Sequence, residues 1–326
     1  MFDTITYILY ILYVITILLL VEPHHKACIL HKSVFTYLSG SFIVSLLCCM
    51  ALFGFDVGMY NNNPLVDDWF GIPVMYGTQT NPNGFALILF PNMAFLPYII
   101  SKSETFKGAI LISTIFLPIF LCILLTGSRS ILIATLIVIF TFRYLDRLGH
   151  TTINLRKLFT LFLFKILPLL LIFIFLLSSL IISLTDGGQD LIDLKGESTD
   201  LRLSAFREMI NIIIDNPFGI GYGNLPPILE DRVGVLMGAH NILFGIIIDF
   251  GILAGLIFIL LMFMIAFSYL KAFNSSVLYR PEIALFFALF IGYIVNGIAH
   301  EGYINFTFWF VVWLSSLFNI KNSTSS

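Results

Sequence analysis

The sequence has few charged residues. Asp, Glu, Lys and Arg make up 11% of the chain, whereas about 25% is usual in a soluble globular domain. Hydrophobic residues make up 59%, and the mean hydropathy is +0.99. This composition excludes a soluble enzyme and predicts an all-α, polytopic integral membrane protein. Since each spanning helix takes about 20 apolar residues, there is no room for a separate soluble catalytic domain, and we expect residues 1–326 to form a single membrane domain.

The sequence also lacks the motifs of several common chemistries. It has no Gly-x-Ser-x-Gly elbow, no Walker loop and no Asp-rich cation motif. Of its four cysteines, Cys48, Cys49 and Cys122 fall inside apolar runs, where a thiol behaves as a small hydrophobe. His24, His25 and His31 cluster, but their spacing fits no closed zinc site. We therefore expect no metal and no cofactor, and the net charge of -2 suggests no nucleic-acid partner.

Nine apolar runs are long enough to predict membrane-spanning helices. They cover residues 2–21, 34–54, 84–100, 109–126, 129–145, 158–184, 241–270, 283–299 and 303–320. The first run resembles a signal peptide, but no basic residues precede it and no small-x-small cleavage site follows Val21. We expect this run to be retained as the first span. The predicted fold is thus a bundle of about nine transmembrane helices, with one large outer loop over residues 185–240.

The basic residues indicate the orientation of the chain, because cytoplasmic loops are enriched in Lys and Arg. With alternate loops assigned to the cytoplasm, eleven of the seventeen basic residues lie on one side. They are Lys26, Lys32, Lys102, Lys107, Arg143, Arg147, Arg156, Lys157, Lys271, Arg280 and Lys321. We therefore expect an inner-membrane (plasma-membrane) protein, with its N-terminus outside and its C-terminus in the cytoplasm.

Five basic residues remain on the outer side, where positive charge is unusual. They are Arg129, Lys195, Arg202, Arg207 and Arg232. Arg129 lies in the short turn Thr126-Gly-Ser-Arg-Ser130 between two apolar runs, where an unpaired charge near membrane depth is costly. Either an outer ligand needs this arginine, or it pairs with an acidic neighbour or caps backbone carbonyls.

The outer loop contains a predicted amphipathic helix that begins at Leu201, after the N-capping sequence Ser198-Thr-Asp200. Leu203, Phe206, Ile210 and Ile213 recur at helical spacing, so the helix should lie on the membrane surface or over the bundle. Arg202 is in its first turn. A cation there opposes the helix dipole, which an anion held between the guanidinium and the free N–H groups would explain. The alternative is a solvated surface arginine.

Two further segments of the loop carry candidate residues. Asn216-Pro217 should end the helix, and Phe218-Gly-Ile-Gly-Tyr-Gly-Asn224 should form a turn that either brings backbone close to a ligand or is only a turn. His240-Asn241 lies at the mouth of the seventh span. A single histidine there is either a structural residue of the interface or a catalytic base. Asp249, farther along that span, is expected to face the bundle, because an acid facing lipid is costly.

In order along the chain, four segments resemble motifs of the O-antigen ligase and polymerase family. They are Leu125-Thr-Gly-Ser-Arg-Ser-Ile-Leu132, Leu201-Arg-Leu-Ser-Ala-Phe206, Asp215-Asn-Pro-Phe-Gly-Ile-Gly-Tyr-Gly-Asn224, and Ala239-His-Asn-Ile-Leu243 together with Asp249-Phe-Gly-Ile-Leu-Ala-Gly255. Asn81-Pro-Asn-Gly84 is also similar to that family, and the resemblance extends over residues 80–270. Members usually have about ten to twelve spans, against the nine counted here.

The resemblance implies a metal-independent glycosyltransferase that acts on undecaprenyl-diphosphate-linked glycans at the periplasmic face. By their match to the motifs, the catalytic residues would be Arg129, Arg202 and His240. The two arginines suit a lipid diphosphate because guanidinium groups bind its oxygens in bidentate fashion. His240 could accept the proton of an acceptor hydroxyl, or alternatively bind phosphate.

Further candidates are of second rank. Those for substrate binding are Arg207, Arg232, Asn241, Gly221 and Gly223, and His300 and Glu301 lie in the short outer hairpin before the last span. The expected partners are the lipid-linked donor, a glycan or lipid A core as acceptor, the bilayer, and a possible chain-length regulator.

Three functions remain open from the sequence. We favour a polymerase, whose acceptor is another lipid-linked repeat unit, because of the glycine-rich loop. A ligase would instead transfer the glycan to lipid A core or to a protein. A transporter or flippase would also place polar residues in the membrane, but it would favour sites near the midplane and a repeat between the two halves.

Overall fold

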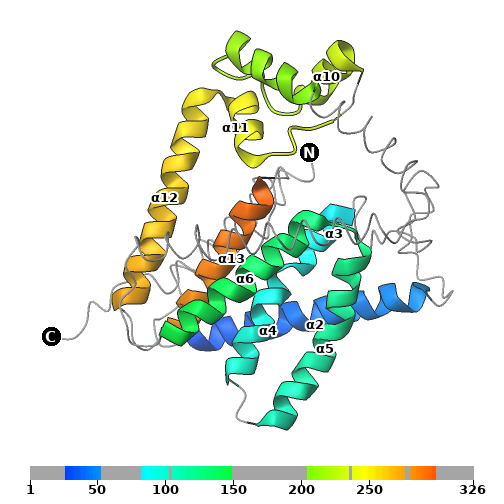
Figure 1. Cartoon of the computed structure of the whole chain (residues 1–326), viewed down its shortest axis with the longest axis vertical. Helices are drawn as coiled ribbons and strands as arrows, with labels where there is room; N and C mark the ends of the chain where they lie inside the picture. Colours follow the sequence, from blue (N-terminus) through cyan, green and yellow to red (C-terminus); the bar gives the residue numbers. More distant parts are fainter. Residues whose placement is uncertain are drawn as a thin grey trace, which may run out of the picture. The chain divides into compact units, whose positions relative to one another are not determined.

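The computed structural model describes residues 26–52, 82–102, 105–148, 204–234, 237–275 and 280–298. In these residues every regular element is a helix, as the composition predicts (Figure 1). Four stretches are long and apolar enough to cross a membrane: Lys32–Met50, Pro82–Ile100, Ile252–Ser275 and Arg280–Gly297. The predicted spans at 2–21, 158–184 and 303–320 lie outside the described residues, so the count of nine stays a prediction.

Contacts divide the chain into two compact units. The first contains Met1–His150 and Lys271–Gly292, together with Phe306–Ser326, and the second contains Thr151–Leu270 and Tyr293–Asn305. The described helices of the first unit are α2 (Lys26–Leu52), α3 (Pro82–Leu89), α4 (Pro91–Lys102), α5 (Phe106–Leu125) and α6 (Arg129–Leu148), with most of α13 (Arg280–Gly297). Those of the second unit are residues 204–215, α10 (Leu225–Val233), α11 (Ile242–Phe250) and most of α12 (Ile252–Ser275).

The predicted third span is two helices in succession, because the helical pattern is interrupted at Phe90. Pro91 has no N–H to donate and also restricts the backbone of the residue before it. The side chain of Asn92 forms hydrogen bonds at this break. Its Nδ2 donates to Leu89 O at 2.8 Å and to Ser41 Oγ of α2 at 3.0 Å. Asn92 is fully buried, so its bonds replace a backbone contact that lipid could not supply.

Buried aromatic residues fill the first unit. Phe85 and Phe90 pack there with Phe142 of α6 and Phe290 of α13, all at most 2% exposed. Gly292 lets α13 approach closely, because a methyl group at this position would lie 2.4 Å from Val138 Cγ2 and 2.6 Å from Phe90 Cζ. The hydroxyl of Tyr98 donates to Glu282 Oε1 at 2.8 Å, inside the same core.

The predicted seventh span, residues 241–270, is also divided, and here the expectation of one continuous helix is wrong. Gly251 separates α11 from α12 and has φ 92 and ψ 168, which no α-helical residue adopts. Gly255 of α12 lies against α11, since a methyl group there would be 2.3 Å from Ile247 Cγ1. The two helices therefore pack beside each other near the N-terminal end of α12 (Figure 1).

Candidate functional site

A short turn between α5 and α6 presents Arg129. Thr126 Oγ1 donates to Ile123 O at 2.7 Å, and Gly127 takes a left-handed backbone with φ 66. Thr126 and Ser128 are buried, whereas Arg129, the first residue of α6, is exposed. Among the residues that the structure describes, its guanidinium has no hydrogen bond or ion pair, so the pairing alternative finds no support there.

The helix predicted in the outer loop is present over residues 204–215, and it ends at Asn216-Pro217 as expected. Asn216 closes it, because its backbone N and its Nδ2 both donate to Ile212 O, at 2.9 and 3.1 Å. Arg202 lies outside the described residues. Arg207 is exposed, and its side chain has no ion pair or hydrogen bond within the described part of the chain.

Of the described residues in the predicted apolar face of this helix, only Ile213 packs against the core of the second unit, and the membrane-surface alternative stays a prediction. Ala205, Met209 and Ile212 are at most 2% exposed and pack into a core with residues of α10 and α11, whereas Phe206 and Ile210 remain exposed. The sequence pattern combined two neighbouring apolar faces into one. Only the tertiary contacts decide which of the two is packed.

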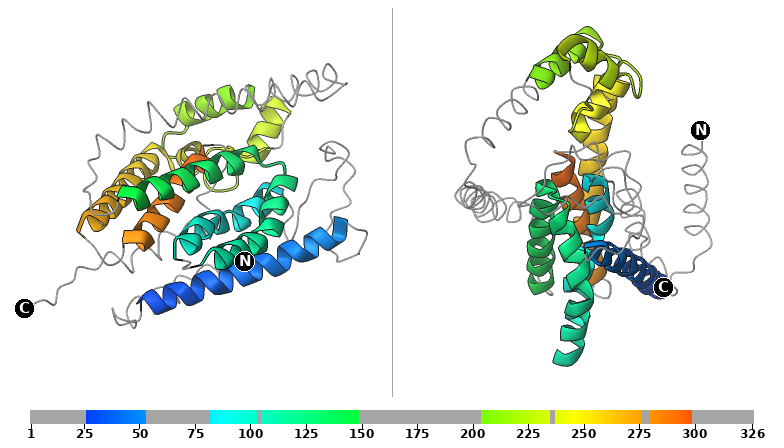
Figure 2. Two further views of the ribbon diagram at one scale, coloured as in Figure 1. Left: turned by 60° about the horizontal axis from the view of Figure 1, so that its bottom comes forward. Right: turned by 90° about the vertical axis from the view of Figure 1, so that its right-hand side faces the viewer.

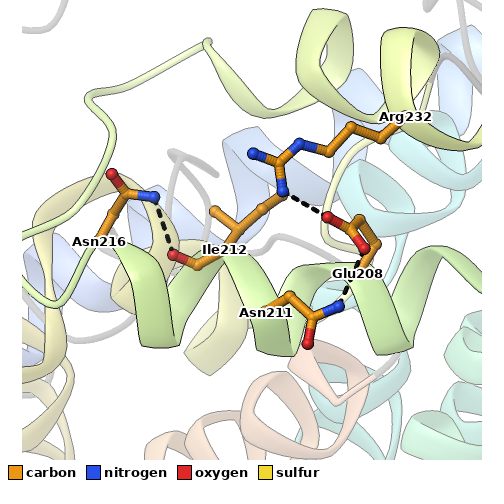
Figure 3. A network of polar contacts seen from close by, with 5 residues as sticks. All are labelled: Glu208, Asn211, Ile212, Asn216 and Arg232. Carbon is orange, nitrogen blue, oxygen red and sulfur yellow. Dashed lines mark hydrogen bonds and ion pairs between the residues drawn. The ribbon is translucent and has the colours of Figure 1, made fainter.

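Arg232 of α10 has an ion-pair partner that the sequence did not reveal. Its Nη1 donates to Glu208 Oε1, and Glu208 Oε2 accepts from Asn211 Nδ2 at 3.0 Å (Figure 3). These contacts, the hydrogen bond from Arg232 first, lower the pKa of Glu208, and the same hydrogen bond raises the pKa of Arg232. The pair joins the helix of residues 204–215 to α10, and a role for Arg232 in substrate binding stays a prediction.

The glycine-rich loop is held against the break between α11 and α12 by backbone hydrogen bonds. Ile220 N donates to Ile248 O at 2.8 Å, Gly221 N donates to Asp249 O at 3.0 Å, and Ile252 N donates to Pro217 O at 2.9 Å. Asp249 itself is buried, as expected. Two segments that sequence reasoning treated as separate motifs therefore form one backbone-to-backbone contact.

The glycines of this contact have different tasks. Gly219, Gly221 and Gly223 all have left-handed backbones, with φ 88, 87 and 82, which cost other residues about 1–2 kcal/mol. Gly219 is also in close contact: a methyl group there would lie 2.6 Å from Asp249 O and 2.7 Å from Gly251 N. Gly223 has no such neighbour within 4 Å. The close approach predicted for a ligand is, at Gly219, an approach to the chain's own backbone.

His240 directly precedes the N-cap of α11. It is exposed and has φ 47, the one positive φ outside glycine in the described residues. Asn241 Oδ1 accepts from Leu243 N at 2.9 Å and from Phe244 N at 3.1 Å, while its Nδ2 donates to Ile298 O at 3.0 Å. Asn241 thus caps α11 and ties it to the C-terminal end of α13. These bonds fix the backbone that carries His240, and substrate contact by either residue stays a prediction.

The candidate residues are divided between the two units. Arg129 belongs to the first, and Arg207, Arg232, Asn241 and His240 belong to the second. His300 and Glu301 lie outside the described residues. Sequence reasoning missed Gly251, although its place after Asp249-Phe250 within an apolar run is a signal for a helix break.

The long apolar helices define the class of this chain: it is an integral membrane protein. Residues 114–259 match the family model described as O-Antigen ligase. The match confirms, over this stretch of the chain, the resemblance carried by the motifs. It is shorter than the 80–270 that the motifs suggested, and Asn81–Gly84 precede it. No match to the chain was found among the curated proteins or the solved structures.

Proposed function

We propose that the chain is a membrane glycosyltransferase that polymerises undecaprenyl-diphosphate-linked repeat units, of O-antigen or capsule type, at the periplasmic face of the inner membrane. The observation that carries this proposal is the O-Antigen ligase match over residues 114–259. That stretch contains Arg129, Arg202 and His240, the three residues to which the family motifs assign the reaction. Polymerisation and the carrier lipid are inferences from the resemblance.

The lengths of the helices support an outer position for Arg129. Arg147 lies near the C-terminal end of α6, and 18 residues at 1.5 Å per residue separate it from Arg129 by about 27 Å. This is close to the thickness of the hydrocarbon core. With Arg147 and Arg143 assigned to the cytoplasmic side by the positive-inside rule, this length is consistent with the predicted outer position of Arg129.

The same reasoning applies to His240. Asn241, next to it, bonds to Ile298 just beyond the end of α13, and Arg280 begins that helix. The 18 residues of α13 separate its ends by about 27 Å. With Arg280 assigned to the cytoplasmic interface by the positive-inside rule, this length is consistent with the predicted outer position of His240, where a lipid-linked glycan is accessible.

The proposed reaction needs one proton transfer and one displacement. His240 accepts the proton of an acceptor hydroxyl while that oxygen bonds to the anomeric carbon of the donor sugar. The bond from this carbon to the diphosphate breaks, with inversion, and the electron pair leaves on the lipid diphosphate. Arg129 and Arg202 stabilise the developing negative charge through bidentate, charge-assisted hydrogen bonds, and two guanidinium groups can do this without a divalent ion.

Single substitutions test the proposal in a strain that depends on this chain for long glycans. Arg129→Ala, Arg202→Ala and His240→Ala should each abolish long chains while the protein is still expressed. A positioned base contributes about 100- to 10,000-fold, so His240→Ala should lose activity in that range. The activity of Arg129→Lys should lie between that of wild type and that of Arg129→Ala, because lysine keeps the charge but not the bidentate geometry.

Arg143→Ala is the matched control, since Arg143 is an exposed arginine at the opposite end of the same helix. It should leave the chain-length ladder unchanged. Normal ladders from all three alanine variants, at wild-type expression, would refute the assignment.

A ligase is the second candidate, because the matching family model is described as O-Antigen ligase. The two enzymes share the donor and differ in the acceptor. Loss of the polymerase leaves single repeats attached to the acceptor, whereas loss of a ligase leaves long chains on the carrier lipid. Extracting the lipid-linked and the transferred glycans from a deletion strain therefore separates them.

A further inference from the structure

The helix of residues 204–215 has three faces rather than two. At 3.6 residues per turn, Ala205, Met209 and Ile212 share the face that packs into the second unit. A second face carries Ser204, Glu208, Asn211 and Asp215, which are polar. Between these two faces lies a third, which is apolar and exposed.

This third face, the apolar stripe, consists of Phe206, Ile210 and Ile214, and Phe218, beyond the end of the helix, is a further exposed apolar residue. The exposed fractions are 39%, 41%, 69% and 93%, so they rise along the chain. The packed face supplies all the side chains of this helix that are buried in the core of the unit. The stripe therefore has no role in packing the described part of the second unit beyond one contact of Phe206 with Phe244, whose ring centroids are 4.7 Å apart.

The stripe continues into the exposed surface of α12. Pro217 O accepts from Ile252 N at 2.9 Å, and a methyl group on Gly251 would lie 2.9 Å from Phe218 Cα. Phe218 therefore borders the first turn of α12. The exposed apolar residues of that helix include Leu253, Leu256, Leu260, Phe263 and Phe267. The helix of residues 204–215 runs across the N-terminal end of α12 (Figures 1 and 2), as a helix in the membrane plane crosses the end of a spanning one.

We propose that the apolar stripe and Phe218 are immersed in the lipid leaflet that surrounds the N-terminal end of α12. The helix of residues 204–215 is then an interfacial anchor, with one face on the protein, one in lipid and one in water. Lipid is the occupant because the stripe is continuous with the lipid-facing side of a spanning helix, and because a contiguous exposed apolar surface marks an interaction site. Arg207 borders the stripe beside Ile210, one turn along the helix, where its guanidinium can reach phospholipid phosphates.

The anchor fixes the depth of the loop behind it. Gly221 and Ile220 of the glycine loop are bonded to the end of α11, and only Asn216 and Pro217 separate the loop from the end of the anchor helix. A helix held at the interface therefore holds the α11–α12 break at the same level. This inference needs only membrane insertion, and it stands whether or not the chain transfers sugars.

Lipid contact of the apolar stripe can be tested with site-directed spin labels on the full chain, in nanodiscs of phosphatidylethanolamine and phosphatidylglycerol. With the four native cysteines replaced by alanine, labels are placed at Ile210→Cys and Ile214→Cys, and as matched controls at Asn211→Cys and Asp215→Cys on the polar face. The ratio of accessibility to O2, which partitions into lipid, over that to a water-soluble nickel chelate should be several-fold higher at the first pair.

Two results would overturn the proposal. Stripe labels that favour the nickel chelate would place the face in water, and stripe labels shielded from both reagents would mean that a second copy or another protein covers it. Where the cysteine-free chain does not fold, Ile214→Trp in a chain whose three native tryptophans are replaced by phenylalanine should be quenched several-fold more strongly by brominated lipid than Asn211→Trp. Equal quenching would likewise refute lipid contact.

Discussion

Replacing Gly219 by alanine should detach the glycine loop from the break between α11 and α12. The new methyl group would lie 2.6 Å from Asp249 O, 2.7 Å from Gly251 N and 2.8 Å from Asp249 C. All three are backbone atoms, which cannot rotate away as a side chain can. The loop must therefore move, and the hydrogen bonds from Ile220 N and Gly221 N weaken with it.

The magnitude follows from two contributions. Alanine in the left-handed region costs about 1–2 kcal/mol at Gly219, where φ is 88. Each backbone hydrogen bond contributes about 0.5–1.5 kcal/mol net, so losing both adds about 1–3 kcal/mol. Gly223→Ala is the matched control: its φ is 82, but nothing lies within 4 Å of the added methyl group. Gly223→Ala should therefore lose only about 1–2 kcal/mol, the cost of alanine in the left-handed region, as at Gly219.

The two variants are compared by thermal unfolding in detergent and by hydrogen exchange. Gly219→Ala should lower the melting temperature about twice as much as Gly223→Ala, and it alone should accelerate exchange at the amides of Ile220 and Gly221. Equal melting temperatures and unchanged exchange would show that the loop does not depend on this close approach, and the account of the docked break would be wrong.

Two other substitutions test the packing of each unit. Gly292→Ala should destabilise the first unit by about 1–3 kcal/mol, because its methyl group would meet Val138 and Phe90 at 2.4 and 2.6 Å, and thermal unfolding measures this. Glu208→Gln should remove the ion pair with Arg232. Since this pair lowers the pKa of Glu208, its stabilising effect is present at neutral pH and is lost as the pH falls through that lowered pKa. The melting temperatures of Glu208→Gln and wild type should therefore converge in acid and in high salt, and a constant difference would contradict the assignment.

The sequence predicts the class of the fold well and the breaks in its helices poorly. Long apolar runs predict helices because lipid offers the backbone no other hydrogen-bonding partner, and this rule holds over every described run. It does not predict where a helix stops inside the membrane. At Phe90 the signal was Pro91, which one sequence can supply. At Gly251 the glycine itself is a signal, but the residues that hold the break through backbone bonds, Pro217 and Ile220, lie more than 30 residues away.

The sequence likewise predicts only part of the candidate site. The sequence could predict an exposed arginine between the apolar runs of α5 and α6, because charge is costly in an apolar run. It could not predict that Arg232 pairs with Glu208, since neither residue type nor spacing selects one partner among several acids. It also could not separate the packed face of residues 204–215 from the exposed one, because Met209 and Ile210 are equally apolar.

The break at Gly251 also changes how the segment 241–270 can cross a bilayer. The nine residues of α11 reach about 13 Å, less than half of the hydrocarbon core, whereas the 24 residues of α12 reach about 36 Å. Only α12 can span, and α11 folds back beside it, as the contact between Gly255 and Ile247 requires. His240 directly precedes the N-cap of α11, and the glycine loop holds the other end of that helix through Ile248 and Asp249. The two motifs are therefore mechanically linked through one short helix, so a substitution in the loop that touches no substrate can still displace His240.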